Sequence, residues 1–295
     1  MLKKIYGYFL NVLVKLFGID FAKQVDAYLR FKRKLNLKNP QTLADKVTYL
    51  FLHKSTPLMS TCTDKWAVRK YIASKGLADI LIPTVGGPWS KVEEIDFEAL
   101  PDQCILKATH GCKMNYIISD KTQFNPTDCK RVLQTWLDTT YGTYSLEPHY
   151  KTIPHRVYAE QLLSAPQGLI DYKFHCLNGV PAFVLVCSER HQASNGAMQL
   201  TRELFSPTWQ SFCDEILPPC APTHKAPLRF KQMLEIAQVL SADFPFVRVD
   251  LYELNGKIYF GELTFSPASG VFGHFSDAFI TKMGNKLTIA EKNYA

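Results

Sequence analysis

The sequence predicts an α+β protein in which antiparallel β-hairpins alternate with helices. Asn-Gly pairs at 178–179 and 255–256 each lie between two runs rich in β-branched and aromatic residues. Such a pair favours a type I′ hairpin turn. Segment 231–244 instead spaces its apolar residues three and four apart, as one face of a helix requires. Because two-residue turns join only antiparallel strands, we do not expect a doubly wound parallel sheet.

The composition is that of an ordinary globular protein, with 295 residues, of which 46% are hydrophobic and 21% charged. This length suits one large domain or two to three subdomains. The eight cysteines show no CxxC or Cys/His spacing that would predict a zinc site or a redox pair. We therefore expect free cysteines and a protein of the reducing cytoplasm.

The positive charge of the chain belongs to its N-terminal end. The first 54 residues hold 11 Lys or Arg and 3 Asp, whereas the remainder holds 23 basic and 24 acidic side chains. Within this end, Asn11 and Lys15 interrupt the apolar run, so it is too broken to span a bilayer. The sequence predicts a basic helical segment at 1–55. Its residues 1–38 can lie on an anionic membrane surface at the inner face, or they can pack on their own domain or form a dimer surface.

Two helices are expected next. The first lies in segment 39–53, with Thr42 as its N-cap. The second lies in segment 60–76, with Thr63 or Asp64 as its N-cap. Further helices are expected at 126–140 and 231–244. The expected strands cover 80–89 (ended by a Gly-Gly-Pro turn), 103–111, 115–119 and 155–163, with hairpins over 171–190 and 247–264.

The last hairpin carries two carboxylates among residues that suit buried strands. With the turn at 255–256, Asp250 and Glu262 stand nearly opposite each other. Opposed like charges destabilise a hairpin unless a cation lies between them. A Mg²⁺ ion bound together with phosphate is the simplest candidate. The alternative is a surface hairpin whose two acids are solvated.

Five segments together resemble a known family. In chain order they read TDKWAVRKYI, LPDQCILKATHG, RVYAEQLL, DYKFHCLNG and FPFVRVDLYELNGKIYFGELTFSPASG. They resemble the TupA-like ATP-grasp family, which is associated with teichuronopeptide and surface-polysaccharide synthesis. The resemblance implies an ATP-grasp fold, in which two α+β subdomains clasp ATP. Its implied parts are an N-terminal part (56–105), a small subdomain with the phosphate loop and hinge strand (106–165), and a large subdomain with the metal-binding hairpin (166–295).

The resemblance also implies the residues that bind ATP. They are Lys65, Lys107, His110, Gly111, Lys113, Glu160, Gln161, Leu163, Asp171 and Lys173. The two lysines Lys65 and Lys107 would hold phosphates, backbone groups of Gln161 and Leu163 would pair with adenine, and Asp171 would take the ribose hydroxyls. The loop THGCKMN corresponds to the phosphate-covering loop, although family members usually have more glycine there.

Metal-binding and catalytic residues follow from the same resemblance. Asp250, Glu262 and Thr264 occupy the positions that bind Mg²⁺, with two ions expected, and Thr264 stands where many ATP-grasp enzymes have Asn. The catalytic residues that the resemblance implies are Lys107 and Arg248, and Arg248 would neutralise phosphate or an acylphosphate. Arg190 is a third catalytic candidate on its own position, because it ends an expected strand just before a loop and could grip the carboxylate of an acceptor.

The resulting hypothesis is a carboxylate–amine ligase that works through an acylphosphate. It would join an amino acid or similar amine to a uronic-acid carboxylate of a capsular or other surface polysaccharide, or of its precursor. Alternatives are a glycosyltransferase-type enzyme, an ATP-dependent phosphotransferase, and a module that binds ATP without catalysis. No DxD motif of a sugar-nucleotide enzyme lies near the predicted site. The tryptophans do not form a nucleic-acid stacking platform, so no nucleic acid is expected as a partner.

Overall fold

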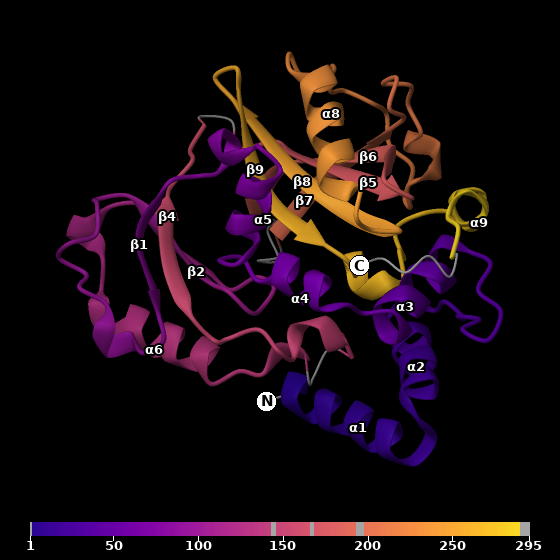
Figure 1. The fold of residues 1–295 in the computed structure, drawn as a ribbon, viewed down its shortest axis with the longest axis horizontal. Coiled ribbons are helices and arrows are strands. Elements are labelled where there is room, and N and C mark those ends of the chain that lie inside the picture. The colour runs from indigo at the N-terminus through magenta and orange to yellow at the C-terminus, as the bar shows by residue number, and fades with distance from the viewer. Residues whose placement is uncertain (1, 143–145, 166–167, 193–197, 290–295) are drawn as a thin grey trace. The chain divides into compact units, whose positions relative to one another are not determined.

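The computed structural model describes the chain except residues 1, 143–145, 166–167, 193–197 and 290–295. Its described residues form helices and two antiparallel sheets (Figure 1), which confirms the predicted α+β class. The chain divides into two compact units. Unit 1 contains residues 1–11 and 55–163, and unit 2 contains residues 12–54 and 164–295.

Unit 1 is built on a four-stranded sheet in the order β1-β4-β2-β3. Its strands are β1 (Thr84–Trp89), β2 (Cys104–Ala108), β3 (Asn115–Ile118) and β4 (Val157–Gln161). Its helices include α4 (Pro57–Thr63), α5 (Val68–Ser74) and α6 (Pro126–Leu137). The apolar side chains of β2 and β4 pack with those of α6, where Cys129 and Leu133 are completely buried. This core fixes the sheet on which Lys107 and Glu160 stand.

Unit 2 is built on a five-stranded sheet in the order β7-β6-β5-β8-β9. Its strands are β5 (Asp171–Leu177), β6 (Val180–Gln192), β7 (Met198–Phe205), β8 (Phe246–Leu254) and β9 (Lys257–Thr264). Its helices include α3 (Leu43–His53), α8 (Phe230–Ser241) and α9 (Asp277–Lys286). Asn178 and Asn255 have φ angles of 52° and 53°, and the glycine after each also has positive φ. Both predicted hairpin turns are therefore confirmed.

The N-terminal segment is helical, as the sequence predicts. It forms α1 (Leu2–Phe17) and α2 (Ile19–Phe31), and Gly18 separates the two helices with a φ of 85°. Thr42 then begins α3 with a complete capping box, in which its side chain and that of Asp45 each accept a backbone N–H from the other residue. Within the described part of the chain, none of the helices has the length and apolar character needed to cross a membrane.

The structure differs from the sequence prediction in three elements. The helix expected at 60–76 is divided into α4 and α5, because Asp64 adopts an extended conformation and its side chain accepts N–H bonds from Trp66 and Ala67. Strand β1 begins only at Thr84 and continues through the Gly-Gly-Pro sequence, where irregular pairing with β4 absorbs the extra backbone. Strand β7 is absent from the prediction, because polar residues interrupt its apolar pattern.

Candidate functional site

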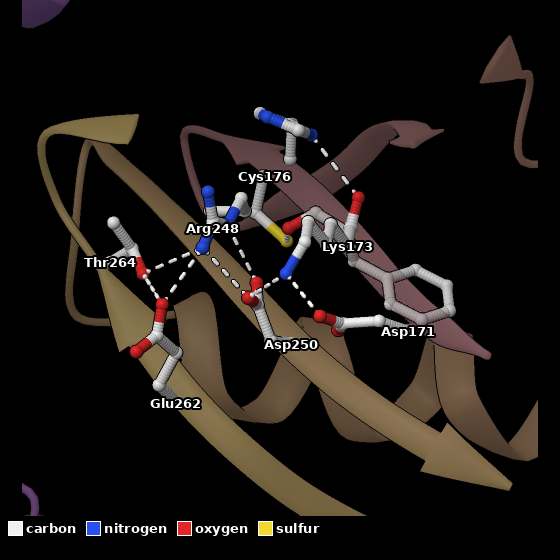
Figure 2. A network of polar contacts seen from close by, with 9 residues as sticks. Asp171, Lys173, Cys176, Arg248, Asp250, Glu262 and Thr264 are labelled. Atoms are coloured by element: carbon white, nitrogen blue, oxygen red, sulfur yellow. Dashed lines mark hydrogen bonds and ion pairs between the residues drawn. The ribbon is translucent and has the colours of Figure 1, made fainter. Parts of the chain in front are cut away.

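A cluster of charged side chains lies on β5, β8 and β9, all within unit 2 (Figure 2). In the sheet register Asp250 stands opposite both Lys173 and Glu262, and Arg248 stands opposite Thr264. Since alternate residues of a strand share a face, these five side chains come to the same side of the sheet. The predicted pairing of Asp250 with Glu262 is therefore present.

Arg248 connects the three residues that were assigned to the metal. Its Nη2 atom donates to Asp250 Oδ2 at 2.7 Å, to Glu262 Oε1 at 2.9 Å and to Thr264 Oγ1 at 3.1 Å. Its Nε atom donates to Asp250 Oδ1 at 2.6 Å. One cationic nitrogen thus contacts all three side chains, as Figure 2 shows. In this structure the guanidinium group separates the two opposed carboxylates.

Lys173 adds a second cation to the cluster. Its Nζ atom lies 2.5 Å from Asp171 Oδ2 and 2.6 Å from Asp250 Oδ2. Burial is the largest single effect and disfavours the charged form of Lys173, but the carboxylates of Asp250, Asp171 and Glu262 together raise the pKa of the lysine above its ordinary value. Burial also raises the pKa of Asp250, against the opposing effect of Arg248 and Lys173. The cluster contains three acids (Asp171, Asp250 and Glu262) and two bases (Lys173 and Arg248), so its net charge is −1 if all five side chains are ionised.

The donor set suits Mg²⁺. Carboxylate and hydroxyl oxygens are the ligands that this ion prefers, and Mg–O distances are about 2.0–2.1 Å. The oxygens of Asp250, Glu262 and Thr264 converge on Arg248 Nη2, so an ion held by all three would have to take the place of this nitrogen. Among the described residues, no group of three or more His, Cys, Asp and Glu side chains could hold a metal.

A second charged group lies in unit 1, on the neighbouring strands β2 and β4. Lys107 Nζ lies 2.5 Å from Glu160 Oε2, and the other oxygen of Glu160 accepts bonds from Tyr158 at 3.1 Å and Arg69 at 3.4 Å. Lys65 Nζ donates to the carbonyl oxygen of Gly111 at 2.6 Å. Within the described part of unit 1, Lys107 and Glu160 of the predicted ATP-binding residues are thus paired with each other, and Lys65 contacts the predicted phosphate loop.

His110 is turned inward from that loop. Its side chain is buried, its Nε2 atom lies 2.9 Å from the carbonyl oxygen of Trp136, and its ring stacks on His155 with centroids 3.9 Å apart. Burial lowers the pKa of His110 to about 4, so the ring is neutral near pH 7. The side chain therefore fastens the loop to the end of α6.

The other predicted residues occupy varied environments. Lys113 is exposed and has a φ of 61°, and Leu163 is partly buried just beyond β4. The backbone N–H of Gln161, expected to pair with adenine, donates to the carbonyl oxygen of Pro83 at 2.9 Å. Arg190 belongs to β6, but its side chain lies outside the described residues.

The segment after Thr264 contacts Arg30, a residue that was not among the predicted site residues. Ala268, Ser269 and Gly270 have φ angles of 49°, 57° and 75°, a left-handed run that two non-glycine residues rarely adopt. Arg30 of α2 donates to Ser269 Oγ at 3.3 Å, and Thr48 of α3 donates to the carbonyl oxygen of Gly270. In the sequence, Arg30 stands out just by its place next to the basic run FKRK, which does not predict a contact with residue 269.

The chain is similar to a known protein family and to several solved structures. The model of the TupA-like ATP-grasp family matches residues 45–288. No curated protein matches the sequence. Among solved structures, the D-alanine–D-alanine ligase of Helicobacter pylori is 11% identical, with 77% of this chain and 61% of that chain covered and a TM-score of 0.43.

Two further solved structures are similar at the same level. The D-alanine–D-alanine ligase of Bacillus anthracis complexed with ATP is 14% identical, with 77% of this chain and 63% of that chain covered and a TM-score of 0.43. A D-cycloserine synthetase is 14% identical, with 79% and 72% covered and a TM-score of 0.46. The chain thus spans less than two thirds of the length of the two D-alanine–D-alanine ligases. The family match, by contrast, extends over most of the sequence, and the chain belongs to the TupA-like ATP-grasp family.

Proposed function

We propose that the protein is an ATP-dependent carboxylate–amine ligase. In this reaction a substrate carboxylate attacks the γ-phosphate of ATP and gives an acylphosphate and ADP, and an amine then displaces the phosphate. The observation that carries the proposal is the convergence of Asp250, Glu262 and Thr264 on one cationic nitrogen of Arg248. Membership of the ATP-grasp family supports it.

Asp250, Glu262 and Thr264 would hold Mg²⁺, with two ions expected. When bound, the metal would neutralise phosphate oxygens and hold them in place. Arg248 would then lose its bonds to the three oxygens, and its guanidinium would be available to stabilise negative charge on the transferred phosphoryl group. Arg190 would bind the acceptor carboxylate.

The remaining assignments concern ATP itself. In unit 1, Lys65 and Lys107 would bind phosphate oxygens, aided by Gly111 and Lys113. Because the His110 ring is buried, any contact of that residue with the nucleotide would come from its backbone. Backbone groups of Gln161 and Leu163 would pair with adenine, beside Glu160. In unit 2, Asp171 would bind the ribose hydroxyls, with Lys173 beside it.

We further propose that the carboxylate belongs to a uronic acid of a capsular or other surface polysaccharide or its precursor, and that the amine is an amino acid. The contact between Arg30 and Ser269 supports an anionic acceptor, because it places a guanidinium beside the segment that follows the proposed metal ligands. The net positive charge of the first 54 residues also favours an anionic glycan. We propose that the reaction takes place in the cytoplasm, at the inner face of the membrane.

The test is an incubation of the protein with MgATP, a panel of uronic-acid glycans and a pool of amino acids. ADP release and product masses are followed for the wild type, for Glu262→Gln and for the matched variant Glu235→Gln, whose carboxylate is exposed on α8. We expect a product heavier by one amino acid minus water from the wild type and Glu235→Gln, and none from Glu262→Gln.

Other products would identify a different reaction. A mass gain of one phosphate would indicate a phosphotransferase. Turnover of a nucleotide sugar without ADP release would indicate glycosyl transfer. Equal ADP release with and without every carboxylate offered would contradict the ligase.

A further inference from the structure

The N-terminal helices carry an unusual concentration of exposed apolar side chains. Of the large apolar residues that are exposed in the described part of the chain, eight lie within the first 29 positions. They are Ile5, Tyr8, Phe9, Leu16, Phe17, Phe21, Tyr28 and Leu29. Contiguous apolar surface of this kind marks an interaction site more often than scattered single residues do.

On α1 these side chains share one face. Ile5, Tyr8, Phe9 and Leu16 follow helical spacing, and their exposed fractions are 57%, 72%, 41% and 68%. Leu10, on the opposite face of the helix, is only 2% exposed. The helix thus uses one apolar face for the fold and leaves a second one, called here the outer face of α1, in contact with solvent.

The apolar surface continues around the turn into α2. Gly18 ends α1, and Phe17 and Phe21 lie on either side of it with ring centroids 5.0 Å apart. Both rings are exposed. Aromatic rings at the end of an apolar helix face are typical of proteins that rest in the headgroup region of a bilayer.

Charge decides which occupant fits this surface. Lys15 is exposed on α1, and Lys32, Lys34 and Lys38 are exposed just after α2. The first 54 residues have a net charge of +8, so a second copy would bring like charge against like. Anionic lipid headgroups attract such a segment, while the acyl region accepts the apolar side chains. At 16 residues, α1 is about 24 Å long and would lie along the surface rather than cross it.

We propose that the outer face of α1, together with the Phe17–Phe21 pair, docks the protein on a membrane that contains anionic lipids. Residues such as Tyr8 and Leu16 would enter the boundary between headgroups and acyl chains, and the lysines would contact the headgroups. Docking does not depend on ATP or on the ligase reaction, and it can therefore be tested separately.

The experiment is flotation of the protein with vesicles of phosphatidylcholine alone or of phosphatidylcholine mixed with anionic phosphatidylglycerol, whose headgroups attract basic segments. We expect the wild type to float with the anionic vesicles. Tyr8→Gln/Leu16→Gln should reduce the partition coefficient at least tenfold, about 1.4 kcal/mol. The matched control Ile117→Gln/Leu228→Gln removes exposed apolar side chains elsewhere and should bind like the wild type.

A second variant tests the electrostatic part. Lys15→Gln/Lys32→Gln/Lys34→Gln should float less with anionic vesicles, and the difference should vanish at 0.5 M salt because screening removes the headgroup attraction. Circular dichroism and thermal unfolding of each variant confirm that it is folded. A wild type that stays unbound, or a Tyr8→Gln/Leu16→Gln variant that floats as well as the wild type, would overturn the proposal. So would a wild-type dimer that this variant dissociates, since a second copy would then cover the face.

Discussion

At the scale of single residues, Arg248 explains how two opposed carboxylates are tolerated on one hairpin. Its guanidinium bonds to both Asp250 and Glu262, and these carboxylates raise its pKa above the ordinary value despite burial. Arginine keeps its proton at any pH that a protein tolerates. A change of pH therefore does not remove the cation between the carboxylates, although another cation can replace it.

Replacement of Arg248 by Gln should destabilise unit 2. Among the described residues, the change leaves Lys173 as the one cation paired with the buried Asp250 carboxylate. Loss of one partner of a buried ion pair costs about 3–5 kcal/mol. We expect a fall of that size in the free energy of unfolding in urea. Added Mg²⁺ should restore part of it, because the ion takes the place of the guanidinium between the two carboxylates.

The matched control for this prediction is Arg131→Gln, which removes an exposed arginine whose only ion pair is with the exposed Asp128 among the contacts of the described residues. Surface pairs contribute about 0–1 kcal/mol, so this variant should stay close to the wild type. Equal stabilities of the two variants would mean that Arg248 is not the cation that holds the hairpin together.

At the scale of elements, the parts of the fold that depend on local chemistry could be predicted from the sequence. Asn255 and Gly256 readily adopt positive φ, so the turn and the opposition of Asp250 and Glu262 could be read directly. The left-handed run beginning at Ala268 could not, because neither alanine nor serine favours that conformation. Contacts from α2 and α3, distant in sequence, hold it there.

The candidate site divides in the same way. The position of the turn predicted the opposed pair Asp250 and Glu262, whereas Arg248 and Thr264 were predicted from the resemblance to the family. The sequence did not reveal that Arg248 would lie between the carboxylates, since a side chain's direction depends on the face and register of the sheet. The contact of Arg30 with Ser269 spans 239 positions, which no local pattern encodes.

Replacement of Gly270 by Ala should test the left-handed segment. At a φ of 75° a side chain is strained, and the new Cβ would lie 2.6 Å from Phe51 Cε1 and 2.8 Å from Thr48 Oγ1. Gly256→Ala is the matched control in the same unit, with a φ of 72° but no atom within 4 Å of the new Cβ. Both variants bear the conformational strain, and only Gly270→Ala bears the steric conflict.

We therefore expect Gly270→Ala to lose about 1–3 kcal/mol more of the free energy of unfolding than Gly256→Ala does. Urea unfolding followed by tryptophan fluorescence measures the difference. Similar losses in the two variants would show that Phe51 and Thr48 move aside without cost and that α3 does not brace this segment.

At the scale of the whole molecule, buried histidines link stability to pH. Burial lowers the pKa of His110 to about 4 and that of His149 to about 3, from an ordinary value of 6.5. The unfolded chain takes up protons on these rings below pH 6.5, whereas the folded protein does so only near the lower values. The stabilisation is complete above pH 6.5 and is lost as the pH falls.

We expect the free energy of unfolding to fall between pH 6 and pH 4.5, with a slope of about 1.4 kcal/mol per pH unit for each such histidine. Urea titrations at several pH values measure this slope. His149→Gln should reduce this slope by the contribution of one histidine, about 1.4 kcal/mol per pH unit. This expectation holds even if the variant also changes the free energy of unfolding at pH 7.5. A variant slope equal to that of the wild type would contradict the assignment to buried neutral histidine.

The division of unit 2 into residues 12–54 and 164–295 has a consequence for synthesis on the ribosome. The four strands of unit 1 all lie between residues 84 and 161, so its sheet can form early. Thr48 of α3 can bond to Gly270 only after a further 222 residues have been synthesised. At 5–20 residues per second, this delay is about 10–45 s. During that time the face of α3 that is buried in the folded protein lacks these partners, and its apolar side chains are exposed on the nascent chain until residue 270 has been made.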